Sequence, residues 1–327
     1  LGRVRSRSVL LSMGGIVATG NLVAIVAIHF LNAGPWGWDF LYDALAGVAG
    51  GLTVSMVVAL FLPVFEHLFS VVTDIRLLEL SNQNLPLLRT LALEAPGSYQ
   101  HSLMLGHLAE AAAEAIGADT LLARVSGYYH DIGKTKMPDY FIENQSKGFN
   151  RHDRLEPSMS ALIIAAHVKE GVEMARKARL PEPIATAIRE HHGTKLIRYF
   201  YQKAVTRSDG EPEGVHETDY RYPGPKPSTR ILGILMIADA VEAASRTLIE
   251  PTPAKIRAMI QAIVDDCLRD AQFDDCDLTM RDLSIIVATL ERTVTPVFHH
   301  RIDYPGFDFN RERTRRRTAE GSAGAAG

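Results

Sequence analysis

The sequence predicts an all-α protein in which a hairpin of two transmembrane helices is followed by a cytoplasmic helical bundle. Two apolar runs, residues 9–31 and 40–62, are each long enough to cross a bilayer as a helix. Beyond residue 63 the composition is that of a soluble protein, with apolar residues at helical spacing and almost no strand-like alternation. We therefore expect helices on both sides of this boundary.

The charges that flank the two apolar runs predict their orientation. Arg3, Arg5 and Arg7 precede the first run, whereas the connecting turn, residues 32–39, contains no Lys or Arg. By the positive-inside rule, both ends of the hairpin face the cytoplasm. The first run is too long for a secretory signal peptide and lacks a clear small-residue cleavage site. Because the chain starts at Leu1 rather than Met, we expect it to be a fragment of a longer protein.

Composition and helical spacing divide the chain into four expected parts. Residues 1–63 form the transmembrane hairpin, and residues 64–97 form a helical stalk. Residues 98–300 form the bundle, and residues 301–327 form a basic tail that we expect to be disordered.

Two local patterns inside the bundle carry further expectations. Ser98 follows Pro96-Gly97 and is the expected N-cap of the first bundle helix. Residues 134–155 and 203–228 are rich in polar residues, Pro and Gly, and both are expected to be loops. Because the second of these loops is long and precedes a candidate site residue, we expect it to cover the site.

Charge and cysteine content exclude several classes of function. A net charge of −3 gives no argument for a nucleic-acid polymer as a partner. The two cysteines, Cys267 and Cys276, are too far apart for a CxxC motif and are expected to be reduced thiols. Walker-type glycine-rich loops and GxSxG motifs are absent from the sequence.

The central feature of the bundle is an adjacent His130-Asp131 doublet at the end of an apolar helical run, followed by Lys134. An uncompensated carboxylate in a buried helix is costly, so buried charges pair or bind metal. Asp239 lies within the apolar run 231–241 and needs a partner of this kind. With the neighbouring histidines there are seven candidate metal ligands: His101, His130, Asp131, His167, His191, His192 and Asp239.

The seven residues suit two adjacent metal sites if Asp131 bridges both ions. One site then takes His101, His130 and Asp239, and the other takes His167, His191 and His192. Two ions so placed hold a bridging hydroxide and stabilise an in-line displacement at phosphorus. A set of nitrogen and oxygen ligands without sulfur favours iron or manganese over zinc.

Each of these residues also has a structural explanation when it is considered singly. His191 and His192 suit the C-terminus of a helix, where the dipole favours imidazolium, and Asp131 suits an N-cap. The occurrence of all seven in this order favours metal binding. For Lys134 two roles stay open, contact with a substrate phosphate and an ordinary surface lysine.

Four further motifs accompany the doublet, at residues 73–89, 94–102, 140–145 and 221–227. With the order His, His-Asp, His, His-His and Asp, they make the chain resemble the HD-domain phosphohydrolase superfamily. Within it, the chain is similar to the seven-transmembrane-receptor HD proteins of the PgpH type, from the first apolar run to about Thr295. This resemblance implies the C-terminal part of such a protein, with its last two spans and its HD domain.

The resemblance also implies a location and an activity. The protein would be a multi-pass protein of the bacterial cell (inner) membrane, with its catalytic domain in the cytoplasm. The implied reaction is hydrolysis of cyclic di-AMP to pApA by a metal-activated hydroxide, with two divalent ions, iron or manganese. Asp131 and Lys134 are the expected catalytic residues, and the seven ligand positions carry over to the set above. The expected partners are the cyclic dinucleotide, membrane lipid and a second copy of the chain in a homo-oligomer.

The substrate preference rests on the resemblance alone. Cyclic di-GMP phosphodiesterases of the HD-GYP type place Gly-Tyr-Pro after their His-His pair, whereas His192 is followed here by Gly193-Thr194-Lys195-Leu196. Two alternatives stay open: an HD phosphohydrolase on another phosphate ester such as cyclic di-GMP or (p)ppGpp, and a non-catalytic HD-fold receptor. A receptor of that kind would be expected to have lost ligand positions, and all seven are filled here.

Overall fold

The computed structural model describes residues 7–34, 36–69, 71–145, 150–208, 214–249 and 251–298, and within these ranges the regular secondary structure is helical. An isolated antiparallel bridge joins Leu196 and Arg221. The predicted all-α class is confirmed, whereas the expected disordered tail, residues 301–327, lies outside the described residues. The α-helices are α1 (Arg7–Leu31), α2 (Trp38–Phe69), α3 (Asp74–Leu80), α4 (Pro86–Glu94), α5 (Pro96–Ala115), α6 (Thr120–Tyr129), α7 (Pro157–Lys177), α8 (Glu182–Glu190), α9 (Arg198–Arg207), α10 (Arg230–Ser245), α11 (Pro253–Arg269) and α12 (Met280–Phe298).

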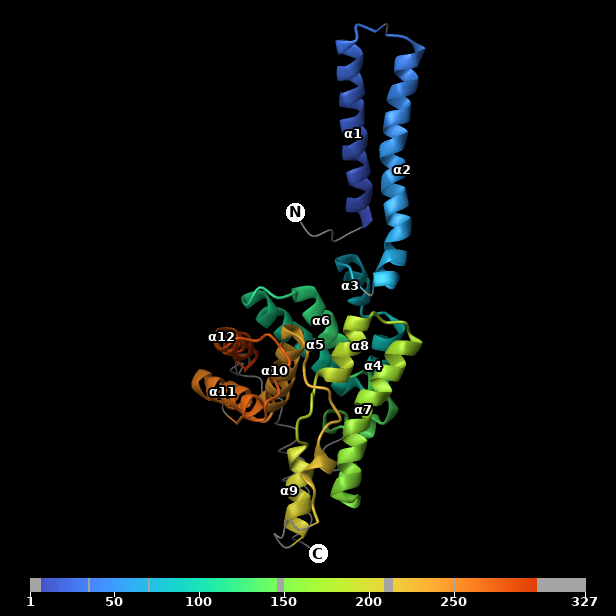
Figure 1. Cartoon of the computed structure of the whole chain (residues 1–327). Helices are drawn as coiled ribbons and strands as arrows, with labels where there is room; N and C mark the ends of the chain where they lie inside the picture. The colour runs from blue at the N-terminus through green and yellow to red at the C-terminus, as the bar shows by residue number, and fades with distance from the viewer. Residues whose placement is uncertain are drawn as a thin grey trace, which may run out of the picture.

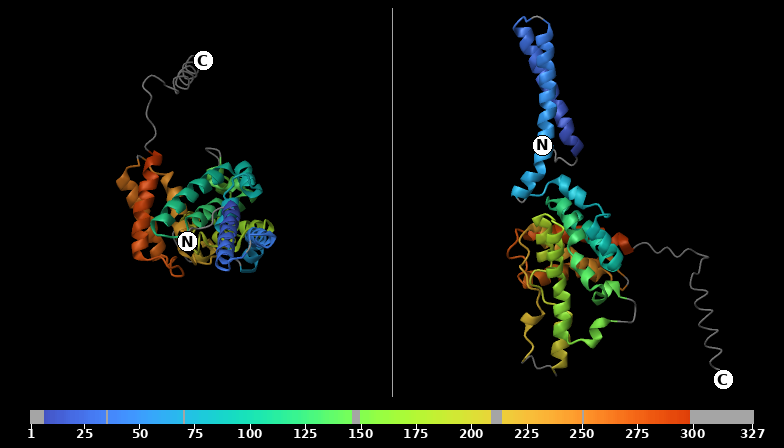
Figure 2. Two further views of the ribbon diagram at one scale, coloured as in Figure 1. Left: turned by 90° about the horizontal axis from the view of Figure 1, so that it is seen from above. Right: turned by 90° about the vertical axis from the view of Figure 1, so that its right-hand side faces the viewer.

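The first two helices form an antiparallel hairpin that projects from the rest of the molecule (Figures 1 and 2). Both are long and apolar enough to cross a membrane, over Ser12–Leu31 and Trp38–Glu66, and most of their surface is exposed. A Cβ atom added at Gly51 would lie 2.5 Å from the backbone nitrogen of Ala18, so this glycine permits the close approach of the two helices. The predicted helical hairpin is confirmed.

The second helix is longer than the apolar run predicts. We expected this span to end at Leu62, but α2 continues through Pro63 to Phe69. The chain then enters α3, which Thr73 caps by accepting a hydrogen bond from the backbone N–H of Arg76. Helix α2 therefore continues past the apolar run, and α3 begins at Asp74, shortly after its end.

The bundle has two main buried apolar clusters. The larger joins α5, α10, α11 and α12, and the second joins α3, α4, α6 and α8 with the end of α7. Residues 232–238 of α10 are all buried, as expected for a helix that is apolar on every side. The candidate site residues come from the helices of both clusters, so packing of the two halves decides the geometry of the site.

Three details differ from the sequence-based expectations. Residues 134–155 contain the short 3₁₀ helices η1 (Ile132–Lys136), η2 (Pro138–Tyr140), η3 (Ile142–Asn144) and η4 (Arg151–Arg154). The expected loop at 203–228 begins inside α9 and includes η5 (Glu217–Tyr220). Ser98 is not an N-cap, because Pro96 already occupies the first turn and Ala95 is the cap residue. The Ser98 hydroxyl instead donates to Glu143, far along the chain.

Candidate metal centre

The structure brings all seven predicted ligand residues together at the junction of the bundle helices. His101 lies on α5, His130 ends α6 and Asp131 follows it. His167 lies on α7, His191 and His192 follow the end of α8, and Asp239 lies on α10.

Glycines beside the His-Asp doublet let these helices approach. A Cβ atom at Gly127 would lie 2.7 Å from the Cα of Gly106, so α6 and α5 touch through their backbones. At Gly133 it would lie only 2.0 Å from the carbonyl oxygen of His167, which places α7 directly against the segment after the doublet. Any side chain at these two positions would separate the elements that carry the site.

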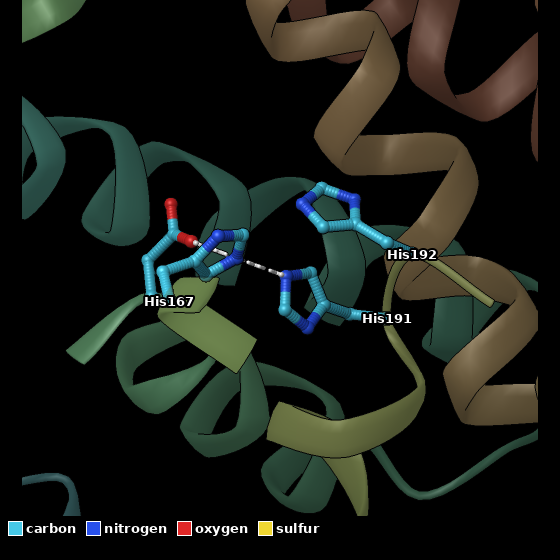
Figure 3. A group of neighbouring side chains, drawn as sticks. His167, His191 and His192 are labelled. Carbon is cyan, nitrogen blue, oxygen red and sulfur yellow. Dashed lines mark hydrogen bonds and ion pairs between the residues drawn. The ribbon is translucent and has the colours of Figure 1, made fainter. Parts of the chain in front are cut away.

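One cluster of potential ligand atoms contains Asp131, His167, His191 and His192, whose atoms all lie within 4.8 Å of one another. His167 Nε2 lies 3.3 Å from Asp131 Oδ1 and 3.3 Å from His191 Nε2. Figure 3 shows the three imidazoles converging on one region. This spacing suits three nitrogen ligands and one carboxylate oxygen around a metal ion.

A second cluster contains His101, His130 and Asp131 and so shares Asp131 with the first. His130 Nε2 lies 3.0 Å from Asp131 Oδ2. Asp239 joins the two clusters, since its Oδ1 is 2.9 Å from His101 Nε2 and its Oδ2 is 3.5 Å from His192 Nδ1. The two oxygens of Asp131 thus face different sets of histidines, as the sequence predicts for a bridging carboxylate.

The polar atoms at the centre lack partners that a metal-free site would need. Within the described part of the chain, His130 Nε2 and both carboxylate oxygens of Asp131 are buried without a well-aligned hydrogen bond, and the Lys134 ammonium lies 2.7 Å from Asp131 Oδ2 as an ion-pair partner. Short distances between them exist, but the geometry does not align a donor with an acceptor. Buried polar atoms without partners are costly, and divalent cations would satisfy these donor atoms, so the residues fit a metal pair.

Backbone carbonyls hold three of the imidazoles in one tautomer. The Nδ1 atoms of His130, His167 and His191 lie 2.6–2.9 Å from the carbonyl oxygens of Gly127, Ile164 and Ile188. In each ring Nδ1–H donates, which leaves the lone pair of Nε2 directed at the cluster. A hydrogen bond of this kind orients histidine ligands in metal sites.

Burial and neighbouring charges keep three of the histidines neutral and Asp131 ionised, which are the forms that bind a metal ion. Burial, together with the neighbouring His130 and His167, lowers the pKa of His191 to about 3. Burial also lowers the pKa of His167 and His192. For Asp131, burial acts to raise the pKa, but the neighbouring His130 side chain and the Lys134 ammonium outweigh it and hold the pKa well below its usual range. His167, His191 and His192 are therefore neutral imidazoles beside an ionised Asp131.

His101 behaves differently because both of its ring nitrogens face carboxylates. Nε2 faces Asp239, and Nδ1 makes a hydrogen bond to Glu242. Burial disfavours the charged ring, but these hydrogen bonds raise the pKa of His101 to about 10. Glu242 is itself held by two hydrogen bonds from the guanidinium of Arg246.

Sequence reasoning missed Glu242 and Arg246. A signal was available, because Glu242 follows Asp239 by one helical turn on an otherwise buried helix. It also missed Tyr222, whose ring stacks on His192 with 4.2 Å between centroids. Tyr222 lies in the segment expected to cover the site, and it does lie against one of the candidate ligands.

Lys134 is placed beside the cluster rather than on the open surface. Its Nζ lies 2.7 Å from Asp131 Oδ2 and 2.8 Å from Glu143 Oε1. Burial opposes its charge, but the two carboxylates outweigh burial and raise the pKa of Lys134. A charged lysine therefore stands next to the candidate bridging carboxylate.

A cavity of about 610 Å³ opens onto the cluster and is lined by His101, Lys134, His167, His192 and Asp239. Its volume lies in the range of small-molecule sites, roughly 300–1,000 Å³. Five aromatic side chains also line it, and we call them the aromatic wall: Tyr140, Phe141, Tyr199, Phe200 and Tyr222.

Comparison with known proteins relates both parts of the chain to one group of proteins. Residues 98–244 match the family described as HD domain, and residues 1–73 match the family described as 7TM receptor with intracellular HD hydrolase. The cyclic-di-AMP phosphodiesterase PgpH of Bacillus subtilis is 43% identical over 306 residues, which cover 93% of this chain and 42% of that protein. PgpH of Listeria monocytogenes is 43% identical over 300 residues, 91% of this chain and 41% of that protein. The chain thus spans about two fifths of the length of these relatives.

The bundle also matches solved structures. The crystal structure of the L. monocytogenes phosphodiesterase PgpH HD domain in complex with cyclic di-AMP is 47% identical, with a TM-score of 0.63. It aligns over 67% of this chain and 100% of the crystallised domain. Sequence, fold and the shared HD domain agree, and this chain belongs to the PgpH-type family of HD-domain membrane proteins.

Proposed function

We propose that this chain is a membrane-anchored phosphodiesterase that hydrolyses cyclic di-AMP to pApA with two divalent metal ions, iron or manganese. One observation carries the proposal: the buried carboxylate of Asp131 lies between two sets of imidazoles, with Oδ2 3.0 Å from His130 Nε2 and Oδ1 3.3 Å from His167 Nε2. The names of the PgpH relatives and the cyclic di-AMP complex of the Listeria domain support the choice of substrate.

In this proposal one ion is held by His101, His130, Asp131 and Asp239, and the other by Asp131, His167, His191 and His192. Two divalent ions so held supply Lewis-acid stabilisation of the phosphodiester oxygens and activate water. The protein keeps Asp131 ionised and directs the Nε2 lone pairs of His130, His167 and His191 at the cluster, through hydrogen bonds to backbone carbonyls.

Lys134 and the aromatic wall are the proposed substrate contacts. The Nζ of Lys134 is a cation at the edge of the cavity and can exchange Glu143 for a substrate phosphate oxygen. Purine bases stack on aromatic side chains, and the residues of the aromatic wall line the same cavity as Lys134.

We also propose the division of the chain that the composition predicts. Residues 1–63 anchor the protein in the bacterial cell membrane, 64–97 are the stalk and 98–300 the catalytic domain, with 301–327 as a tail. The intracellular HD hydrolase of the matched 7TM family supports a cytoplasmic position for the domain. A homo-oligomer stays a prediction.

The test is turnover of cyclic di-AMP and cyclic di-GMP by the purified chain, with Mn²⁺ added and then removed by a chelator. We expect metal-dependent release of pApA, with cyclic di-GMP largely spared. Asp131→Asn is the matched variant: it keeps the side-chain volume, replaces one carboxylate oxygen by an NH2 group that cannot bind metal, removes the negative charge, and is expected to lower metal content and abolish turnover. Full metal occupancy in Asp131→Asn would contradict the bridging role, and no turnover by a metal-loaded wild type would contradict the enzyme.

A further inference from the structure

The face of the bundle next to the membrane hairpin carries three exposed basic side chains at the end of α7: Arg176, Lys177 and Arg179. We call these three residues the basic cluster. Arg176 and Arg179 line a cavity of about 930 Å³ together with Pro63 and Glu66 of α2. The candidate membrane span ends at Glu66, so the basic cluster lies where the chain leaves the apolar span.

The three side chains of the basic cluster form no ion pair with the nearby acidic residues that the structure describes. Within the described ranges, no carboxylate lies within ion-pair distance of any of its three side chains. Arg179 also has a φ of 54°, a conformation that favours Gly or Asn at the end of a helix, so local backbone preference does not explain an arginine here. Three acids line the same cavity. Glu79 and Glu182 are ion-paired with Arg76 and Arg189, whereas Glu66 accepts a hydrogen bond from the neutral Thr73 hydroxyl and offsets one of the positive charges, so the basic cluster keeps a net positive charge.

The surroundings of the basic cluster are apolar. Leu68 and Val71, which flank the end of α2, are 70% and 59% exposed. A second cavity of about 950 Å³ adjoins the first at Arg76, Glu79 and Leu180. Most of its lining is apolar and includes five leucines: Leu78, Leu80, Leu85, Leu87 and Leu180. A free phosphate ion has no apolar part that can contact these apolar side chains. A lipid has both an anionic headgroup and apolar chains, so it can contact the basic cluster and the apolar surface together.

We propose that the basic cluster docks the bundle onto the headgroups of anionic lipids in the membrane that the hairpin anchors. This inference rests on the membrane anchoring in the proposed function. The docked end of α7 and the candidate ligand His167 belong to one helix, which packs on Gly133 beside the His-Asp doublet. Docking therefore fixes the orientation of the metal centre relative to the membrane surface.

The expected strength follows from the number of charges. A basic residue near an anionic leaflet contributes about 1 kcal/mol, which is about fivefold in affinity. Three such residues strengthen the attraction on the order of a hundredfold, and a high salt concentration screens it.

The test uses the whole chain in lipid nanodiscs and measures amide hydrogen exchange in peptides that cover residues 171–182. Discs of phosphatidylcholine are compared with discs that also contain phosphatidylglycerol. We expect exchange at least about tenfold slower in the anionic discs, and loss of this difference in the variant Arg176→Gln/Lys177→Gln/Arg179→Gln. Incorporation into the discs, followed by size-exclusion chromatography, reports the anchoring itself and separates its failure from that of docking.

A matched variant removes the same number of charges at the far end of the bundle. Arg198, Lys203 and Arg207 lie on α9, which Figure 1 places at the end away from the hairpin. Their replacement by Gln is expected to leave protection of residues 171–182 unchanged. Equal exchange in the two kinds of disc would overturn the proposal. So would protection by inorganic phosphate in phosphatidylcholine discs, because it would assign the cluster to a soluble ligand.

Discussion

The carboxylate of Glu242 accepts a hydrogen bond from Nδ1 of His101, and this contact joins α10 to α5 beside the metal centre. Arg246 holds the other oxygen of the same carboxylate through two guanidinium nitrogens. With its Nδ1–H fixed in this way, His101 directs Nε2 at Asp239 and the cluster. Glu242 is therefore a positioning residue for a candidate ligand, and it does not itself need to touch a metal ion.

Replacement of this carboxylate tests that role. Glu242→Gln is expected to weaken metal binding about 10- to 100-fold, the usual effect of losing a partner of a histidine ligand. Metal content after dialysis against defined Mn²⁺ concentrations measures it without reference to turnover. Glu110→Gln is the control, because Glu110 is also paired with an arginine, Arg124, but does not contact the cluster. Equal metal affinity in both variants would contradict the positioning role.

Lys134 gives a prediction that separates substrate binding from metal binding. Its positive charge lies 2.7 Å from Asp131 and opposes a cation there, so Lys134→Gln is not expected to lower metal content. If Lys134 binds a substrate phosphate, the variant loses affinity for cyclic di-AMP and its KM rises about tenfold or more. Steady-state kinetics with metal analysis of the same sample measures both. An unchanged KM would contradict the contact with a substrate phosphate and would leave Lys134 only its ion pairs with Asp131 and Glu143.

The buried histidines predict how the stability of the metal-free protein depends on pH. His191 has a pKa near 3 in the folded state and about 6.5 when unfolded, so the unfolded chain binds the extra proton as the pH falls below about 6.5. Each pH unit between about 6.5 and 3 then costs up to about 1.4 kcal/mol. His101 acts in the opposite direction, because its folded pKa is about 10 and its stabilisation is lost as the pH rises from about 6.5 to 10. These two histidines place the stability maximum near pH 6.5.

Urea unfolding of the metal-free protein at pH 5, 6.5 and 8.5, in the presence of chelator, measures this dependence. His101→Gln is expected to remove the decline above pH 6.5 and to leave the decline below it. A wild-type free energy of unfolding that rises from pH 6.5 to 8.5 would contradict the assigned protonation of His101.

Gly133 predicts a packing effect that involves no charge. A Cβ atom there would meet the carbonyl oxygen of His167 at 2.0 Å and the backbone nitrogen of Gly171 at 2.6 Å, so α7 must move. Gly133→Ala is expected to lower the free energy of unfolding by about 3 kcal/mol, at the upper end for overpacking. Gly171→Ala is the comparison, because its Cβ would chiefly meet the side chain of Ile188, which can shift. Chemical denaturation should rank Gly133→Ala as the more destabilised, and the reverse order would contradict this packing.

Several features of the protein follow from local sequence. The two long apolar runs predict the hairpin, and helical spacing predicts the bundle, since both depend on patterns within one segment. The seven candidate ligands were also found from sequence, because buried His and Asp residues are unusual enough in apolar helices to stand out. The exact end of α2 was not predictable, because Pro63 is tolerated within a helix that continues to Phe69.

By itself, therefore, the sequence determined the all-α class, the hairpin of two long apolar helices and the identity of the seven residues that meet at the centre. Only the tertiary structure decided that Glu242 accepts a hydrogen bond from His101, and that the Ser98 hydroxyl donates to Glu143 and does not cap its own helix. The physical reason is that these partners lie 141 and 45 positions apart in the chain. A hydrogen bond needs its two atoms within about 3 Å, and such proximity comes from the packing of distant helices, which no local pattern of residues encodes.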